Sequence, residues 1–218
     1  MERGINLKGF RLELKVGSMK VRESGYVLVG LMDKSRRCYD MEIAEYYATR
    51  GKLTNLNVIH DAHAALAYAS HEGHLDIAEA LLAAGANKNG TDNCGYTPLI
   101  RAARKGRVEI LKTLLSAGVA KDKASTYDQT ASRMASLNGH VECVKALLVA
   151  KADVNEANKD GVTPLMCASM MGYVEIVKLL LAAGAKKDKV DTIFGKTALT
   201  WATERGQHEI VQLLQQAA

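Results

Sequence analysis

The sequence predicts a mainly α-helical solenoid, built from short helix–turn–helix units that stack in a row. A Gly-x-x-Glu/Asp element followed by Ile or Cys recurs with spacings of 33, 33, 33 and 34 residues, at Gly73, Gly106, Gly139, Gly172 and Gly206. The residues expected to start the first helix of each unit keep this period, at Ala64, Thr97, Thr130, Thr163 and Thr197. Such a period, with two helical patterns per unit, is typical of arrays whose units bury one another's apolar faces.

The clearest unit lies between Asp160 and Ala185. Thr163 is expected to cap its first helix, because the hydroxyl accepts an N–H of the opening turn. Pro164 then occupies the first helical position, where its missing N–H costs nothing. Gly172 is expected to end this helix, and Gly184 supplies the left-handed residue that ends many helices. The unit therefore reads as two short helices separated by a glycine.

These residues resemble the ankyrin repeat. The pattern is Gly-x-Thr-Pro-Leu, then Ala-Ala, then Gly-His-x-Glu-Ile-Val and finally Leu-Leu-Leu, and five copies fall in register over about residues 60–218. The resemblance implies an ankyrin-repeat solenoid whose helix pairs are joined by short hairpin loops. It also implies a protein partner, because ankyrin arrays usually dock one on a concave side made of hairpin tips and inner helices.

Residues 1–27 follow a different pattern. Apolar residues alternate with polar ones, as in a strand, at Phe10, Leu12, Leu14 and Val16. Gly17-Ser18 suits a two-residue hairpin turn. We therefore expect a small, basic, β-hairpin-like segment ahead of the helices.

Residues 28–59 are expected to form a degenerate capping repeat. Glu42-Ile43 lies nine residues before Gly51, which is the spacing that Glu175-Ile176 keeps to Gly184. The five clear repeats then occupy residues 60–218.

Two of the clear repeats depart from the pattern in ways that affect stability. Repeat two has Ala64 in place of the capping Thr, so its first helix should start less firmly. Repeat four has Asp128 for the usual Gly, Ser132 for a core Leu and Lys151 for the helix-ending Gly. We expect repeat four to be the weak point of the stack.

Composition and charge argue against a membrane-spanning or secreted protein and place the basic residues in one segment. The sequence has no run of 18 apolar residues and no signal-peptide core at its start. The four cysteines show no CxxC pairing, which favours reduced thiols and a cytoplasmic location, with the nucleus as the alternative. The net charge of +5 belongs to residues 1–37, which hold nine Lys/Arg and four Asp/Glu.

No pattern for catalysis, a cofactor or a metal is found. The sequence has no GxGxxG, HExxH or GxSxG motif, and Gly25 and Gly30 are followed by Leu31-Met32, where a phosphate-binding loop needs Lys and Ser/Thr. Four histidines cluster between residues 60 and 74, but a rise of about 1.5 Å per residue separates His63 from His71 by about 12 Å. Zinc–nitrogen bonds are about 2 Å. We therefore expect no enzyme, no cofactor and no metal site.

The candidate functional residues belong to a surface for a protein partner. The resemblance directs attention to the inner helices and hairpin tips, and Tyr, Trp, Met and Arg are enriched at interface centres. The candidates are Tyr68, Tyr96, Arg101, Arg104, Lys105, Tyr127, Arg133, Leu137, Asn138, Met170, Met171, Phe194, Trp201 and Arg205. For any one of them the plainer interpretation is that it fills space between repeats.

We expect a monomeric, non-enzymatic scaffold or adaptor that binds a partner protein through an acidic and apolar segment. The acidic part would meet Arg101, Arg104, Lys105, Arg107 and Arg133, and the apolar part Met170-Met171. Two alternatives stay open. In the first, the array is the targeting module of a larger enzyme or regulatory complex. In the second, residues 1–37 bind an acidic surface or a nucleic acid, of which the nucleic acid is the less favoured partner.

One modification site is also a candidate. Leu147 followed by Asp153-Val154-Asn155 is similar to ankyrin sites that an iron-dependent dioxygenase hydroxylates on asparagine. The alternative, which we favour, is a structural Asn155 that tolerates a left-handed turn at a hairpin tip.

Overall fold

The computed structural model describes residues 6–7, 10–11, 62–92 and 94–217. The predicted turn at Gly17-Ser18, the degenerate repeat at 28–59 and most of the basic segment 1–37 lie outside these residues. Within residues 1–30, which form a unit of their own, strand β1 (Asn6–Leu7) pairs antiparallel with β2 (Phe10–Arg11), and Leu7 lies opposite Phe10.

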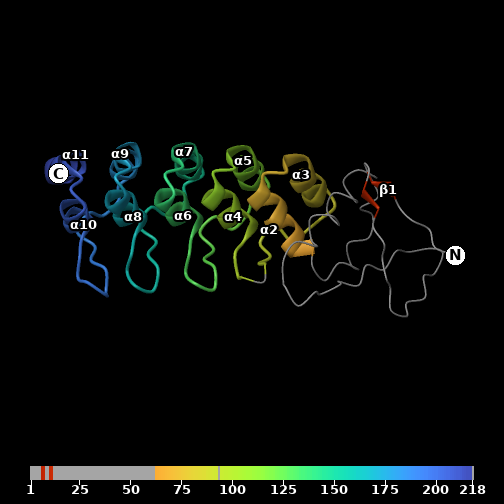
Figure 1. Cartoon of the computed structure of the whole chain (residues 1–218), viewed down its shortest axis with the longest axis horizontal. Coiled ribbons are helices and arrows are strands. Elements are labelled where there is room, and N and C mark those ends of the chain that lie inside the picture. The colour runs from red at the N-terminus through yellow and green to blue at the C-terminus, as the bar shows by residue number, and fades with distance from the viewer. Residues whose placement is uncertain (1–5, 8–9, 12–61, 93, 218) are drawn as a thin grey trace. The chain divides into compact units, whose positions relative to one another are not determined.

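The described part of residues 62–217 is a stack of five helix pairs. The inner helices form one row in Figure 1, the outer helices form a second row beside it, and the loops project from the inner row. The inner helices are α2 (Ala62–Glu72), α4 (Pro98–Lys105), α6 (Ala131–Leu137), α8 (Pro164–Met171) and α10 (Ala198–Glu204). The outer helices are α3 (Leu75–Ala83), α5 (Val108–Ser116), α7 (Val141–Val149), α9 (Val174–Ala182) and α11 (His208–Gln216). The predicted solenoid of helix–turn–helix units is confirmed.

Threonine caps start four of the inner helices. Each hydroxyl accepts a hydrogen bond of 3.2–3.3 Å from the N–H three residues later, at Thr97, Thr130, Thr163 and Thr197. Helix α2, which lacks this cap, begins at Ala62, ahead of the expected Ala64. Without a capping Thr and a following Pro to fix the first turn, the helix-favouring residues around Ala64 extend it toward the N-terminus.

Left-handed residues end the helix pairs where predicted. Gly172 (φ +84°) closes α8, and Gly184 (φ +84°) follows α9. In repeat four, Lys151 takes this conformation at φ +57° and Asp128 takes it at φ +51°, the two positive-φ residues other than Gly in the described chain. Both positions are strained, because a Cβ crowds the backbone there.

The repeating sequence places one continuous apolar core along the stack. A leucine of each outer helix is buried at the same position of every repeat: Leu81, Leu114, Leu147, Leu180 and Leu214. Alanines with no exposed surface lie between neighbouring inner helices, at Ala69, Ala102, Ala135, Ala168 and Ala202. Each buried leucine stabilises the stack by about 1.5–3 kcal/mol, while the small alanines allow the inner helices to approach closely. No described helix is long and apolar enough to cross a membrane.

Candidate protein-binding surface

The hairpin loops are held by a polar residue at the start of each loop. These hairpin anchors keep the 33-residue period, at Asp92, Ser125, Asn158 and Asp191. A side-chain oxygen of each anchor accepts the N–H of the residue four positions later, or five in repeat six with its extra residue, over 2.8–3.3 Å. The loops are therefore fixed before any partner arrives.

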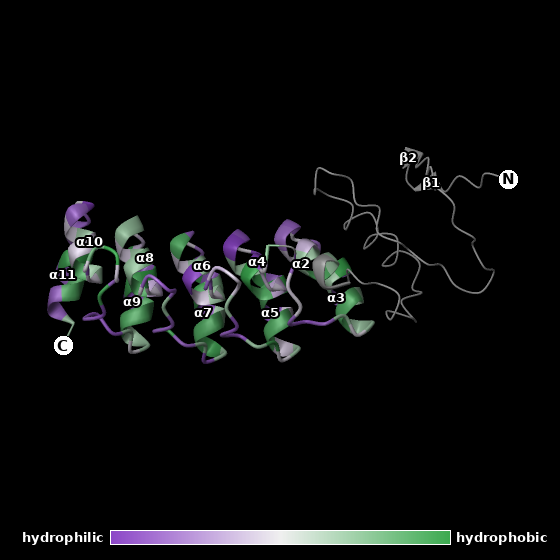
Figure 2. Ribbon diagram, turned by 90° about the horizontal axis from the view of Figure 1, so that it is seen from below, coloured by the Kyte–Doolittle hydropathy of each residue, from purple (hydrophilic) through white to green (hydrophobic). Residues whose placement is uncertain are grey.

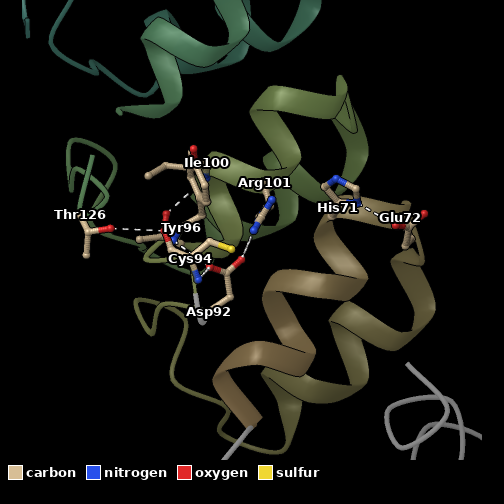
Figure 3. Close-up of polar contacts among 9 residues, drawn as sticks. His71, Glu72, Asp92, Cys94, Tyr96, Ile100, Arg101 and Thr126 are labelled. Atoms are coloured by element: carbon tan, nitrogen blue, oxygen red, sulfur yellow. Dashed lines mark hydrogen bonds and ion pairs between the residues drawn. The ribbon is translucent and has the colours of Figure 1, made fainter. Parts of the chain in front are cut away.

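Asp92 also reaches an inner helix, as Figure 3 shows. One of its oxygens accepts hydrogen bonds from Arg101 Nε at 2.6 Å and Nη2 at 2.5 Å, while the other accepts the N–H groups of Cys94 and Tyr96. The Arg101 guanidinium also lies 4.4 Å from the centroid of the Tyr96 ring. Since the carboxylate neutralises its charge, Arg101 ties the hairpin of repeat three to α4 and is not a free cation for a partner.

Asp191 plays the same part in repeat six. Its carboxylate is buried, and it accepts hydrogen bonds from the Trp201 indole at 2.9 Å and from the backbone N–H groups of Ile193, Phe194 and Lys196. Burial acts to raise the pKa of Asp191, but these hydrogen bonds outweigh it and hold the pKa below its ordinary value. Trp201 is therefore a structural link between α10 and its hairpin.

An aromatic and cationic cluster covers the hairpin of repeat six. The Phe194 ring meets the Trp201 ring edge-on at a centroid distance of 5.6 Å, and Lys196 Nζ lies 4.4 Å from the Trp201 ring centroid. Lys196 is paired with Glu204 at 2.6 Å. Phe194 remains 61% exposed, beside the exposed Ile193 and Val190.

The predicted basic cluster divides into three kinds of residue. Arg104 and Lys105 are exposed, and no carboxylate of the described residues pairs with either. Arg101 is neutralised by Asp92, and Arg107 Nε donates to the carbonyl oxygen of His71. Arg133, predicted as an accessible cation, is instead 9% exposed, because its position corresponds to the buried Ile100 and Met166 of the neighbouring repeats.

The last turns of the inner helices change character along the stack. Figure 2 shows hydrophilic ends on α2, α4 and α10, and more hydrophobic ends on α6 and α8. The residues responsible are Arg104-Lys105 on α4, Leu137 on α6 and Met170-Met171 on α8. Leu137 and Met170 are half-buried, while Met171 is exposed. Cations without a carboxylate partner thus lie one helix away from an apolar strip, and the Arg104 guanidinium lies 5.8 Å from the Tyr96 ring centroid.

The other predicted residues occupy mixed positions. Tyr127 is 64% exposed, and its ring lies 6.4 Å from that of the half-buried Tyr96. Tyr68 is half-buried with its ring 6.5 Å from His71. Asn138 is exposed and donates to the Met134 carbonyl oxygen at the end of α6, and Arg205 is exposed after α10. Accessible members of the set therefore occur from repeat three to repeat six.

Asn155 bridges two loops. Its Oδ1 accepts the N–H of Lys186 at 2.7 Å, and its Nδ2 donates to the Gly184 carbonyl oxygen at 3.4 Å. Asn89 and Asp122 make the equivalent bond to Ala120 and Asp153 one repeat on. Asn155 thus has a structural role, but not the left-handed turn that we expected, because its backbone has no positive φ and its side chain bonds the next loop instead. Its hydroxylation stays a prediction.

No group of three or more His, Cys, Asp or Glu side chains among the described residues is placed to hold a metal ion. Burial raises the pKa of both Cys143 and Cys167 to about 11, so these thiols stay protonated at neutral pH.

Sequence reasoning missed the hairpin anchors. They share a spacing of 33 residues, but Asp, Ser and Asn have no single side chain in common and therefore form no recognisable sequence motif. Only their shared role as acceptors of loop N–H groups reveals the set.

A family model described as ankyrin repeats (three copies) matches residues 31–127 and again residues 130–218. The chain belongs to the ankyrin repeat family. Ankyrin repeats are generally protein–protein interaction modules and are typically not enzymes. A comparison with curated proteins gave no match.

Proposed function

We propose that this ankyrin array is a non-catalytic scaffold that binds a partner protein through a segment carrying acidic and apolar residues. The observation that carries the proposal is the sequence of inner-helix ends, in which the unpaired Arg104 and Lys105 on α4 precede Leu137 on α6 and Met170-Met171 on α8. Helices that pack in a row lie about 8–10 Å apart. An extended segment of about six residues would therefore reach from α4 to α8.

Fixed loops favour binding by this surface. The anchors Asp92 and Asp191 each hold their hairpin through several hydrogen bonds, and the core is continuous through the stack. Because the surface is formed before docking, little conformational entropy is lost on its side of the interface. Exposed Tyr127 and Phe194 supply further apolar contact of the kind that interface centres use.

The proposal is tested by panning a random-peptide display library on the full chain. We expect enriched peptides to combine Asp or Glu with apolar residues. The variant Arg104→Glu/Lys105→Glu should weaken their binding at least tenfold and slow association, because it reverses two charges that meet the ligand.

The matched control is Lys112→Glu/Lys178→Glu, which makes the same charge change on outer helices α5 and α9. Equal losses in both variants would trace the effect to net charge. The proposed surface is rejected if panning enriches no peptide, or if the enriched peptides bind the Arg104/Lys105 variant as tightly as the wild type.

We propose a cytoplasmic location on the ground that three thiols, Cys94, Cys143 and Cys167, are free in the described chain. Fractionation of cells that express the full chain tests this.

A further inference from the structure

Arg133 is a buried cation that no acidic side chain balances. The residue is 9% exposed, and its Nε is fully buried without a hydrogen-bond partner. Its Nη1 donates to Gln129 Oε1, a neutral acceptor. Within the described residues no carboxylate lies within ion-pair distance of the guanidinium. Burying a charge without a counter-charge destabilises a fold.

One nitrogen of the Arg133 guanidinium is left open to a ligand. Nη1 is occupied by Gln129, which leaves Nε–H and Nη2 side by side on the opposite edge of the planar group. A guanidinium N–H donor forms a charge-assisted hydrogen bond with a carboxylate oxygen. Nε is buried, whereas Nη2 makes no hydrogen bond among the described residues and is not one of the buried unpaired atoms, so the guanidinium is accessible at Nη2.

Neighbouring residues hold the guanidinium in place. Gln129 Nε2 donates to the Tyr127 carbonyl oxygen at 2.8 Å, so the chain Tyr127–Gln129–Arg133 fixes the side chain from the hairpin of repeat four. The equivalent positions hold Ile100 and Met166, both buried and apolar. The array therefore accepts an apolar residue here, and packing alone does not require an arginine.

Repeat four carries other features that lower its stability. Asp128 and Lys151 are in the left-handed region, and Ser132 is buried where other repeats have leucine. Strain and unbalanced charge that gather in one part of a fold are typical of a functional site.

We propose that Arg133 receives the carboxylate of an Asp or Glu side chain from the partner protein, held by Nη2 beside the hairpin of repeat four. The inference rests on the proposed scaffold function and adds a specific anchor to it. Arg104 and Lys105 would attract the acidic segment, and Arg133 would fix one carboxylate of it by geometry.

The test follows the Nε–H resonance of Arg133 in the full chain by NMR, assigned by its loss in Arg133→Lys. The probe is N-acetyl-glutamic acid α-amide, and the matched neutral probe is N-acetyl-glutaminamide. We expect a saturable shift with the carboxylate and at least tenfold weaker binding of the amide. The carboxylate should also raise the Tm of the wild type but not of Arg133→Met.

Stability gives a second readout. Arg133→Met, which copies Met166, should melt no lower than the wild type, because it removes an unbalanced buried charge. Lys178→Met removes a positive charge from the exposed face of α9 and should leave the titration unchanged.

Three results would overturn the inference: a resonance that the carboxylate moves no further than the amide, a clearly lower Tm for Arg133→Met, or tighter binding of inorganic phosphate than of the carboxylate. These results would leave the peptide-display test of the scaffold untouched. If the display experiment enriches no peptide but the carboxylate still causes a saturable shift, the scaffold function is rejected and the carboxylate site is supported.

Discussion

Repeat four should gain stability when its two departures from the pattern are repaired. The perturbation is Lys151→Gly together with Ser132→Leu. Lys151 is exposed at φ +57°, so glycine removes the crowding of its Cβ and loses no packing. Ser132 is 7% exposed, where Leu99 and Leu165 are fully buried in the flanking repeats.

The expected gain follows from these two sites. A left-handed residue with a side chain costs about 1–2 kcal/mol, and the greater freedom of glycine in the unfolded chain offsets about 0.4–1 kcal/mol of the relief. Burying a leucine stabilises by about 1.5–3 kcal/mol, less about 1 kcal/mol for fitting it into a packed core. The sum is about 2 kcal/mol, which corresponds to a rise in Tm of about 4–8 °C.

Calorimetry of the full chain measures the change in Tm. Lys151→Ala is the matched control, because it removes the ammonium group but keeps the Cβ and the left-handed strain, and it should give no gain. Native-state hydrogen exchange gives an independent check, since amides of α6 and α7 should exchange faster than those of α5 and α8. If the double variant melts below the wild type, or α6 and α7 exchange most slowly, the departures are not defects and the reasoning is refuted.

Three further predictions concern the loops. Asp191→Asn should lower the Tm near neutral pH, and its difference from the wild type should shrink as the pH falls below about 4. The reason is that a carboxylate with a lowered pKa loses its stabilising effect as the pH falls through its folded-state pKa. A difference in Tm that stays constant down to about pH 2 would argue against a charge effect. The hypothesis that Asn155 is hydroxylated predicts a gain of one oxygen when the full chain is incubated with an asparagine hydroxylase of the ankyrin-modifying kind, and mass spectrometry that finds only unmodified Asn155 would instead support the structural role that we favour. Asn155 accepts a hydrogen bond from the backbone N–H of Lys186 in the next repeat. Asn155→Ala removes this hydrogen bond and should destabilise the array by about 1 kcal/mol, whether or not Asn155 is hydroxylated.

The sequence by itself determined the features that depend on a few neighbouring residues. Thr163 caps α8 because its hydroxyl reaches an N–H three residues away, and Lys151 takes a left-handed turn because the helix pair must end there. Because the sequence repeats every 33 residues, the same caps and helix ends recur along the chain, and the helix pairs stack with their leucines buried.

Tertiary structure decided what each candidate binding residue is free to do. Arg101 and Trp201 looked like contacts for a partner, yet Asp92 and Asp191, nine and ten residues earlier, occupy both. Arg104 on the same helix as Arg101 stays unpaired, because no described carboxylate comes within reach. Arg133 looked like a further surface cation, and its burial without a counter-charge depends on how α6 packs in the stack. Charge pairing and burial depend on atoms from several helices and loops at once, so the spacing of residues in the sequence does not predict them.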